Sequence, residues 1–323
     1  MTKRNTEFTL PEKPQETEIN PLQSFFRKSK LELLLPSRGQ WYPENSLTLN
    51  ANGGLSIFAM TATDDIKFRT GDPTLTGTNI YSIISDCAPG ILHPEEMPHV
   101  DIDAVLLAIR VASYGDEFAF SVTVPNTTLK RKITIISSNL LKEIIERQEK
   151  WDEEIIISDE TMQTLSVNVQ PIPMKYIFST SKSIVQQKKI ITRNFDEDEN
   201  IKDESAFNKS MESLTNSAID LLCSSVKSLK LQNGSNEIIM SLNASNPQDN
   251  LQIKHLIKNL DIGYFNAIRD HIEEQRKKYL FYSDIQTSNE MELAAGAEPT
   301  WRAELSFIGS DFLPEQKINP NII

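Results

Sequence analysis

The sequence predicts an α+β fold built from short antiparallel strands and several amphipathic helices. Two observations lead to this prediction: apolar residues alternate with polar ones in several short runs, and elsewhere they recur at helical spacing. The strand runs and helix runs come in groups, without the regular alternation of βαβ units, which argues against a parallel sheet. No repeat of fixed period is evident in the 323 residues.

Residues 29–130 carry the densest signals, and they are predicted to form a mixed β/α core unit. The clearest helix is predicted to begin with Asp101 or Asp103 as its capping residue. It is predicted to end at Tyr114-Gly115, because glycine is common in the position just after a helix. Two shorter helices precede it, one capped by Thr61 or Thr63 and one from about Thr78 to Pro89-Gly90. Extended segments are predicted at 31–35, 41–49, 55–59 and 118–124.

The rest of the chain divides into an arm, connections and a second unit. Residues 1–28 form a flexible arm, of which 1–21 are expected to become ordered against a partner, because they mix prolines and charges with few apolar anchors. Residues 131–180 form a helix, capped by Ser137 or Ser138, and an extended connection over 162–179. Residues 181–204 form a charged linker, basic and then acidic, with an exposed helix as the alternative.

The second unit, 205–314, is predicted to be helical and to end in a strand, followed by a tail at 315–323. Its first helix carries an apolar stripe from Phe207 to Leu221 that packs on its own chain and is broken by Asn233-Gly234. A helical pair begins near Asp249 and Asp261. The strand covers Trp301 to Phe307.

Composition excludes several classes of protein. The net charge is −12 with Lys and Arg spread along the chain, which argues against a nucleic-acid binder. No apolar run is long enough to span a bilayer, and the N-terminal residues lack the apolar core of a signal peptide, so we expect a cytosolic product. Two distant cysteines, Cys87 and Cys223, cannot form a disulfide framework or a four-cysteine zinc site.

The sequence lacks the common motifs for catalysis and cofactor binding: it has neither a phosphate-binding glycine loop nor a nucleophile elbow. The strongest metal candidate is the pair His93 and His99 with two intervening glutamates, against which an exposed acidic loop is the plainer interpretation. The acid pairs Asp64/Asp65 and Asp101/Asp103 suit helix starts better than acid–base catalysis. We therefore expect no metal and no cofactor.

Five short pieces occur in order and together resemble a known family: Leu35-Pro36-Ser37-Arg38-Gly39, Trp41-Tyr42-Pro43, Ala59-Met60-Thr61-Ala62, Ser85-Asp86-Cys87 and Ile109-Arg110-Val111-Ala112-Ser113-Tyr114-Gly115-Asp116-Glu117. This succession resembles the baseplate hub family of T-even-like contractile-tailed bacteriophages. It covers roughly residues 30–125, with a weaker likeness at 251–275 and 301–314. The family's zinc knuckle, Cys-Pro-x-Cys, has no counterpart here, because residues 122–127 contain no cysteine.

The resemblance implies a non-enzymatic structural protein of the virion, located in the tail baseplate and present in the host cytoplasm during assembly. Its partners would be other tail and baseplate proteins, and a homo-oligomer within the tail stays open. The expected partner-binding residues are Arg38, Trp41, Tyr42, Arg110 and Tyr114, with an ordinary core-and-turn role as the alternative for each. Two other functions stay open: an assembly chaperone absent from the mature particle, and an enzyme with a site around His93 to Asp103.

Overall fold

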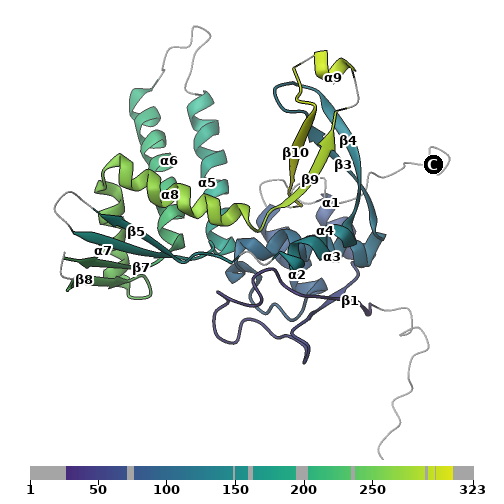
Figure 1. The fold of residues 1–323 in the computed structure, drawn as a ribbon, viewed down its shortest axis with the longest axis horizontal. Coiled ribbons are helices and arrows are strands. Elements are labelled where there is room, and N and C mark those ends of the chain that lie inside the picture. Colours follow the sequence, from purple (N-terminus) through teal and green to yellow (C-terminus); the bar gives the residue numbers. More distant parts are fainter. Residues whose placement is uncertain are drawn as a thin grey trace, which may run out of the picture.

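The computed structural model describes residues 27–70, 76–147, 150–158, 163–193, 203–233, 237–287, 290–294 and 296–307, so the features predicted for 1–21 and 315–323 lie outside the described residues. Within this part of the chain, helices stand beside small antiparallel sheets, and the α+β prediction is confirmed. The molecule has two lobes, each with its own hydrophobic core (Figure 1). No helix in the described ranges has the length and apolar character that crossing a membrane requires.

The first lobe is built around one buried helix, α3 (Ile102–Tyr114). Its residues from Ala104 to Arg110 are all buried, and Gly115 follows it with a φ of 91°, as predicted for the glycine after a helix. The helices α2 (Thr76–Cys87) and α4 (Ser137–Glu146) and the strands β1 (Ser29–Leu33) and β2 (Leu55–Phe58) pack against it. The other elements of this lobe are α1 (Ala62–Thr70), β3 (Glu117–Thr123), β4 (Lys130–Ile136), β9 (Phe281–Gln286) and β10 (Thr300–Leu305).

Three two-stranded antiparallel pairs complete this lobe: β1 with β2, β3 with β4, and β9 with β10. The short helix α9 (Glu290–Ala294) lies between β9 and β10, and two 3₁₀ turns, η3 (Pro94–Glu96) and η4 (His99–Asp101), precede α3. We call the buried side chains of this lobe the first core. It includes Phe281 and Phe307, so residues late in the chain return to the first lobe.

The second lobe contains a four-stranded antiparallel sheet in the order β5 (Glu154–Ser158), β6 (Thr164–Val169), β7 (Val226–Gln232) and β8 (Ile238–Asn243). The strand register places Ile155, Val167, Leu229 and Leu242 in one row across the sheet. Leu222, Ile253 and Ile268 join Val167, Leu229 and Leu242 in the second core, and they come from the helices α6 (Glu204–Ser225), α7 (Pro247–Asn259) and α8 (Ile262–Lys277).

A pair of long helices interrupts the sheet in sequence. Strands β6 and β7 are hydrogen-bonded neighbours, yet α5 (Met174–Arg193) and α6 lie between them along the chain. The two helices run side by side and project from the lobe (Figure 1). The first half of the segment predicted to be a charged linker is therefore helical.

Several sequence predictions about elements are wrong. The extended segment predicted over 162–179 ends early, because α5 begins at Met174 directly after Pro173, where proline is compatible with a helix start. The helix α6 ends at Ser225 rather than at Asn233, and β7 follows at once. Residues 41–49 form turns with a single bridge from Leu47 to Ile91, not a strand.

Two predicted helix caps also differ from the structure. Asp101 occupies the position before α3, but its side chain makes no capping hydrogen bond. At α4 it is Asp116 that accepts hydrogen bonds from the N–H and hydroxyl of Ser138, at 2.7 and 2.6 Å. Helices α7 and α8 begin near Asp249 and Asp261, as predicted; Asn246 caps α7 by accepting from the N–H of Gln248 at 2.9 Å, and Asp261 caps α8.

Candidate functional site

Three of the five predicted partner-binding residues lie on one tight loop between β1 and β2. The turn closes through hydrogen bonds from the Arg38 N–H to the Leu35 carbonyl and from the Gln40 N–H to the Ser37 carbonyl, at 2.9 and 3.1 Å. Arg38 and Trp41 both have positive φ, at 57° and 65°. A left-handed backbone at a bulky residue such as Trp41 costs free energy, so contacts elsewhere must hold the loop in this shape.

The first such contact is a buried carboxylate at the start of α3. Asp101 accepts hydrogen bonds from the N–H of Ser37 at 2.8 Å, from the Ser37 hydroxyl at 2.5 Å and from the Tyr42 hydroxyl at 3.0 Å. Burial raises the pKa of Asp101 to about 6, although these hydrogen bonds act in the opposite direction. Burial and the Asp101 charge also raise the pKa of Tyr42 well above its usual value, so Tyr42 remains a hydrogen-bond donor.

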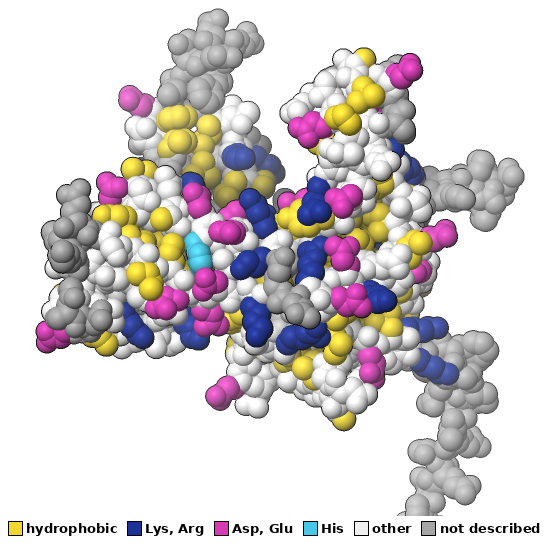
Figure 2. Space-filling model, viewed as in Figure 1, with side chains coloured by type: hydrophobic (Ala, Val, Ile, Leu, Met, Phe, Trp, Pro, Cys, Tyr) yellow, Lys and Arg dark blue, Asp and Glu magenta, His cyan; other side chains and the backbone are white. Residues whose placement is uncertain are grey.

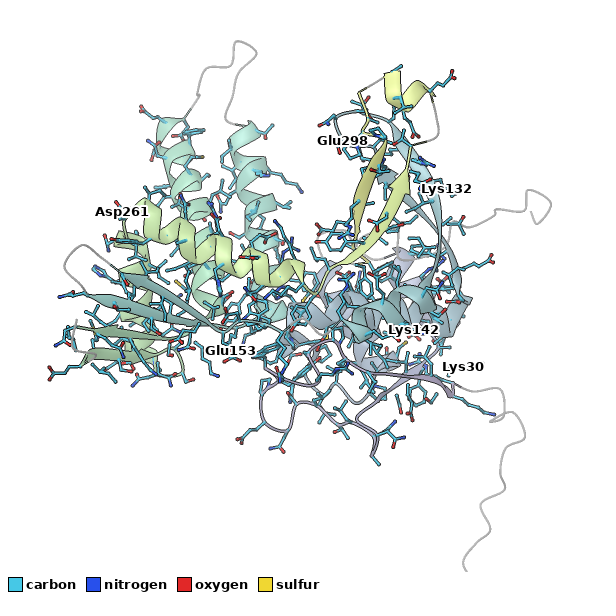
Figure 3. The ribbon with its side chains drawn as sticks, in the orientation of Figure 1. Lys30, Lys132, Lys142, Glu153, Asp261 and Glu298 are labelled. Carbon is cyan, nitrogen blue, oxygen red and sulfur yellow. The ribbon has the colours of Figure 1, made fainter. Side chains whose placement is uncertain are left out.

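The second contact is made by Trp41, whose side chain packs against residues of the second lobe. Its indole N–H donates to the Glu153 carboxylate at 3.1 Å, and its ring stands edge-on to Trp151 and Tyr279, with ring centroids 5.9 and 6.5 Å apart. Figure 3 shows Glu153 where β5 leaves the junction of the two lobes. Edge-on aromatic pairs of this kind stabilise packing beyond the area they bury.

The third contact is made by Arg38, whose side chain is exposed. Its guanidinium donates to the carbonyl of Ile145 at 2.7 Å, in the last turn of α4. A cation suits this place because the last carbonyls of a helix lack intrahelical partners. Arg38, Trp41 and Tyr42 therefore share one loop, but their side chains contact three different parts of the chain: the end of α4, the second lobe and Asp101.

The other two predicted residues lie toward the C-terminal end of α3, Arg110 about 14 Å and Tyr114 about 20 Å along the helix from Asp101. Arg110 is 3% exposed, and its guanidinium carbon lies 4.1 Å from the centre of the Phe118 ring and 5.6 Å from that of Tyr114. Burial lowers the pKa of Arg110. Tyr114 is exposed and donates its hydroxyl proton to Asp65 at 2.5 Å.

The residues considered for metal binding or catalysis contact different segments of the chain. His93 is exposed and faces Glu95 at 3.4 Å, whereas His99 accepts the N–H of Ile172 on its Nδ1 at 2.9 Å. Asp103 accepts the N–H of Phe307 at 2.6 Å, and burial raises its pKa to about 6. In the described ranges, no group of three His, Cys, Asp or Glu side chains is arranged to hold a metal ion.

A small polar cavity lies between α5, α6 and α7. Its volume is about 310 Å³, and its lining includes Ser183, Ser217, Cys223 and the ion pair of Lys254 with Asp220 at 2.7 Å. Burial raises the pKa of the Cys223 thiol to about 11, which keeps it protonated near neutral pH. The cavity therefore offers hydrogen-bonding groups without an activated nucleophile.

Two exposed apolar surfaces were not predicted from the sequence. One is strand β8, where Ile238, Ile239 and Met240 are exposed. The other is the projecting pair of helices, α5 and α6, where Val185 and Met211 are exposed. The two β-branched residues at 238–239 are a strand signal from which this edge could have been predicted.

The chain was compared with protein-family models, with curated proteins and with solved structures, and none of these comparisons finds a match.

Proposed function

We propose that this chain is a structural or assembly component of the baseplate hub of a contractile phage tail, acting through protein–protein contacts and not through catalysis. Its place would be the tail baseplate of the virion, after assembly in the host cytoplasm, and its partners other tail and baseplate proteins. The proposal starts from the resemblance carried by residues 35–43, 59–62, 85–87 and 109–117.

The observation that carries the proposal is the outer edge of β8. Three consecutive large apolar side chains are exposed there: Ile238 at 55%, Ile239 at 53% and Met240 at 43%. Among the described strands, β8 pairs with β7 on one side and with none on the other. The strand also contains neither lysine nor proline, which commonly protect a free edge.

An apolar edge strand of this kind favours association with another chain, although the register of β8 on β7 shifts at Ile239. A strand from a partner can add to such an edge through main-chain hydrogen bonds, with side chains alternating between the two faces. The opposite edge of the same sheet, β5, also exposes an isoleucine, Ile156. A sheet with apolar side chains at both edges suits a subunit that lies between neighbours in a larger assembly.

The same edge would also serve an assembly chaperone that holds a tail subunit and then leaves. The test is a quantitative mass-spectrometric inventory of mature virions, isolated tails and assembly intermediates from a phage that encodes this chain. Recovery from mature tails at a fixed copy number supports the structural role, and recovery from intermediates alone supports the chaperone. Absence from tails and from every intermediate contradicts both.

A further inference from the structure

The cavity between α5, α6 and α7 is lined by helix faces that are polar, whereas helix faces that pack together are normally apolar. The polar side chains recur every three or four residues, so those of each helix lie on one face. They are Tyr176, Thr180 and Ser183 on α5, Ser217 and Asp220 on α6, and Asn250 and Lys254 on α7. Polar faces of three helices around one space are typical of a ligand site between helices and not of a hydrophobic core.

The hydroxyl of Thr180 is a buried polar group that lacks a partner within the described part of the chain. Thr180 lines the cavity and is only 8% exposed, and none of the described residues forms a hydrogen bond with its hydroxyl. Among these residues, the hydroxyl of Tyr176 and the side-chain amide of Asn250 also have no hydrogen-bond partner. A buried polar group without a partner is destabilising, so these three groups indicate a site that water or a ligand fills.

Other polar groups of the lining are paired with one another, and the lining has no net charge. The hydroxyl oxygens of Ser183 and Ser217 lie 3.2 Å apart, and Lys254 donates from its Nζ to the Asp220 carboxylate at 2.7 Å. The charges of Lys254 and Asp220 cancel, and the other lining residues are neutral. Figure 2 shows basic and acidic side chains interspersed over the face that it displays, so charge of one sign does not dominate there either.

We propose that this cavity binds a neutral polyhydroxylated molecule of the size of a monosaccharide, a sugar or a polyol. Each hydroxyl both donates and accepts, so such a ligand can accept hydrogen bonds from Thr180 and Asn250 and donate one to Asp220. It can do so without separating the ion pair, whereas an anion would meet Asp220 and a cation would meet Lys254. The volume of about 310 Å³ lies at the lower end of the range for small-molecule sites, which suits a ligand of this size. This inference does not depend on the baseplate proposal.

The test is ligand-observed nuclear magnetic resonance with the purified full chain and a panel of neutral probes. The sugars are glucose, galactose, mannose and N-acetylglucosamine, and the polyols are myo-inositol and sorbitol, so the panel separates the two sources of this chemistry. At least one probe is expected to bind with a dissociation constant of about 1 mM or lower. The proposal is overturned if no neutral probe binds at about 10 mM, or if phosphate or glutamate binds more tightly than every neutral probe.

Two variants test whether the probe binds in the cavity. Thr180→Val removes the hydroxyl and Asn250→Leu removes the amide, with little change in side-chain size, and each should raise the dissociation constant about tenfold. The matched controls Thr192→Val and Asn259→Leu make the same changes at exposed residues of α5 and α7 and should leave binding unchanged. Without ligand, Thr180→Val should unfold at the same temperature as the unmodified chain or higher, because the lost hydroxyl has no partner within the described residues. Binding by either cavity variant as tight as that of the unmodified chain overturns the proposal.

Discussion

Trp41 and Tyr42 are neighbours in sequence, but their side chains belong to different cores. The Tyr42 hydroxyl donates to Asp101 in the first lobe, whereas the Trp41 ring packs edge-on to Trp151 in the second. The φ of 65° at Trp41 belongs to the turn that sends the two side chains apart. The loop between β1 and β2 is therefore one of the connections that hold the lobes together.

Replacing Trp41 tests this connection. Trp41→Ala removes a half-buried ring and its hydrogen bond to Glu153, and should lower the free energy of unfolding by about 2–4 kcal/mol. We expect urea unfolding followed by circular dichroism to change from one transition to two, because the lobes lose a shared contact. A single unchanged transition with a loss below about 0.5 kcal/mol would show that the loop does not join the lobes.

A comparison with glycine separates the backbone from the side chain. Glycine normally destabilises a position by about 0.5–1 kcal/mol relative to alanine. At Trp41 the positive φ reverses this preference, so Trp41→Gly should be at least as stable as Trp41→Ala in the same urea titration. A clear advantage for alanine would contradict the left-handed backbone at this residue.

The Asp101 carboxyl should change the pH dependence of stability. Its pKa of about 6 in the folded protein lies above its usual value of 3.8. The protonated carboxyl therefore contributes to the free energy of unfolding fully below pH 3.8, and this contribution is lost as pH rises through 6. Compared with Asp101→Asn, the unmodified chain should lose up to about 3 kcal/mol of its relative stability between pH 4 and pH 7. Unfolding titrations of both proteins at each pH measure this difference, and a constant difference would refute the shift.

The His99 imidazole should give the opposite pH dependence of stability. Burial lowers the pKa of the His99 imidazole from 6.5 to about 4. The neutral imidazole therefore contributes to the free energy of unfolding above pH 6.5, and this contribution is lost as pH falls through 4. His99→Asn keeps an acceptor for the N–H of Ile172 but does not titrate in this range. The unmodified chain should therefore lose about 1–3 kcal/mol relative to this variant between pH 7 and pH 4. Parallel curves for the two proteins would count against a buried neutral imidazole.

The helix α3 provides a prediction about core packing and about Arg110. Leu106→Ala removes a buried side chain and should lower the free energy of unfolding by about 2–5 kcal/mol.

Arg110→Ala should lower the free energy of unfolding by about 1–3 kcal/mol, more than the loss of an exposed helix-end charge would, because the guanidinium stacks on Phe118 and is buried. Thermal unfolding of both variants tests this, and an Arg110→Ala protein as stable as the unmodified chain would show that the stacking is unimportant.

The helices and strands that depend on residues close together in the sequence could be predicted from the sequence. Helix α3 follows from its apolar spacing and from Gly115, and the strand at 300–305 follows from its alternation. The boundary between α6 and β7 was missed for a different reason: β7 follows α6 without a glycine or proline between them, so nothing marked where the helix ended and the sheet resumed.

The role of Asp101 could not be predicted from the sequence for a physical reason. Its partner Ser37 lies 64 residues away, so a carboxylate that looks like a helix cap is used by a distant loop instead. Trp41 is similar, because its aromatic neighbours Trp151 and Tyr279 come from the other lobe. The sequence indicated that these residues matter, but the direction of their side chains depends on long-range packing.

The most direct test of the central claim, that this chain acts by protein–protein contact through β8, is the incorporation of two variants into tails. Ile239→Lys places a charge on the exposed edge, and Leu251→Lys places the same charge on α7 at a residue that is 69% exposed. Both proteins should fold normally, because both positions are exposed. The account predicts that quantitative mass spectrometry of purified tails finds Leu251→Lys at the normal level and Ile239→Lys at least tenfold reduced. Equal incorporation of the two variants would contradict it.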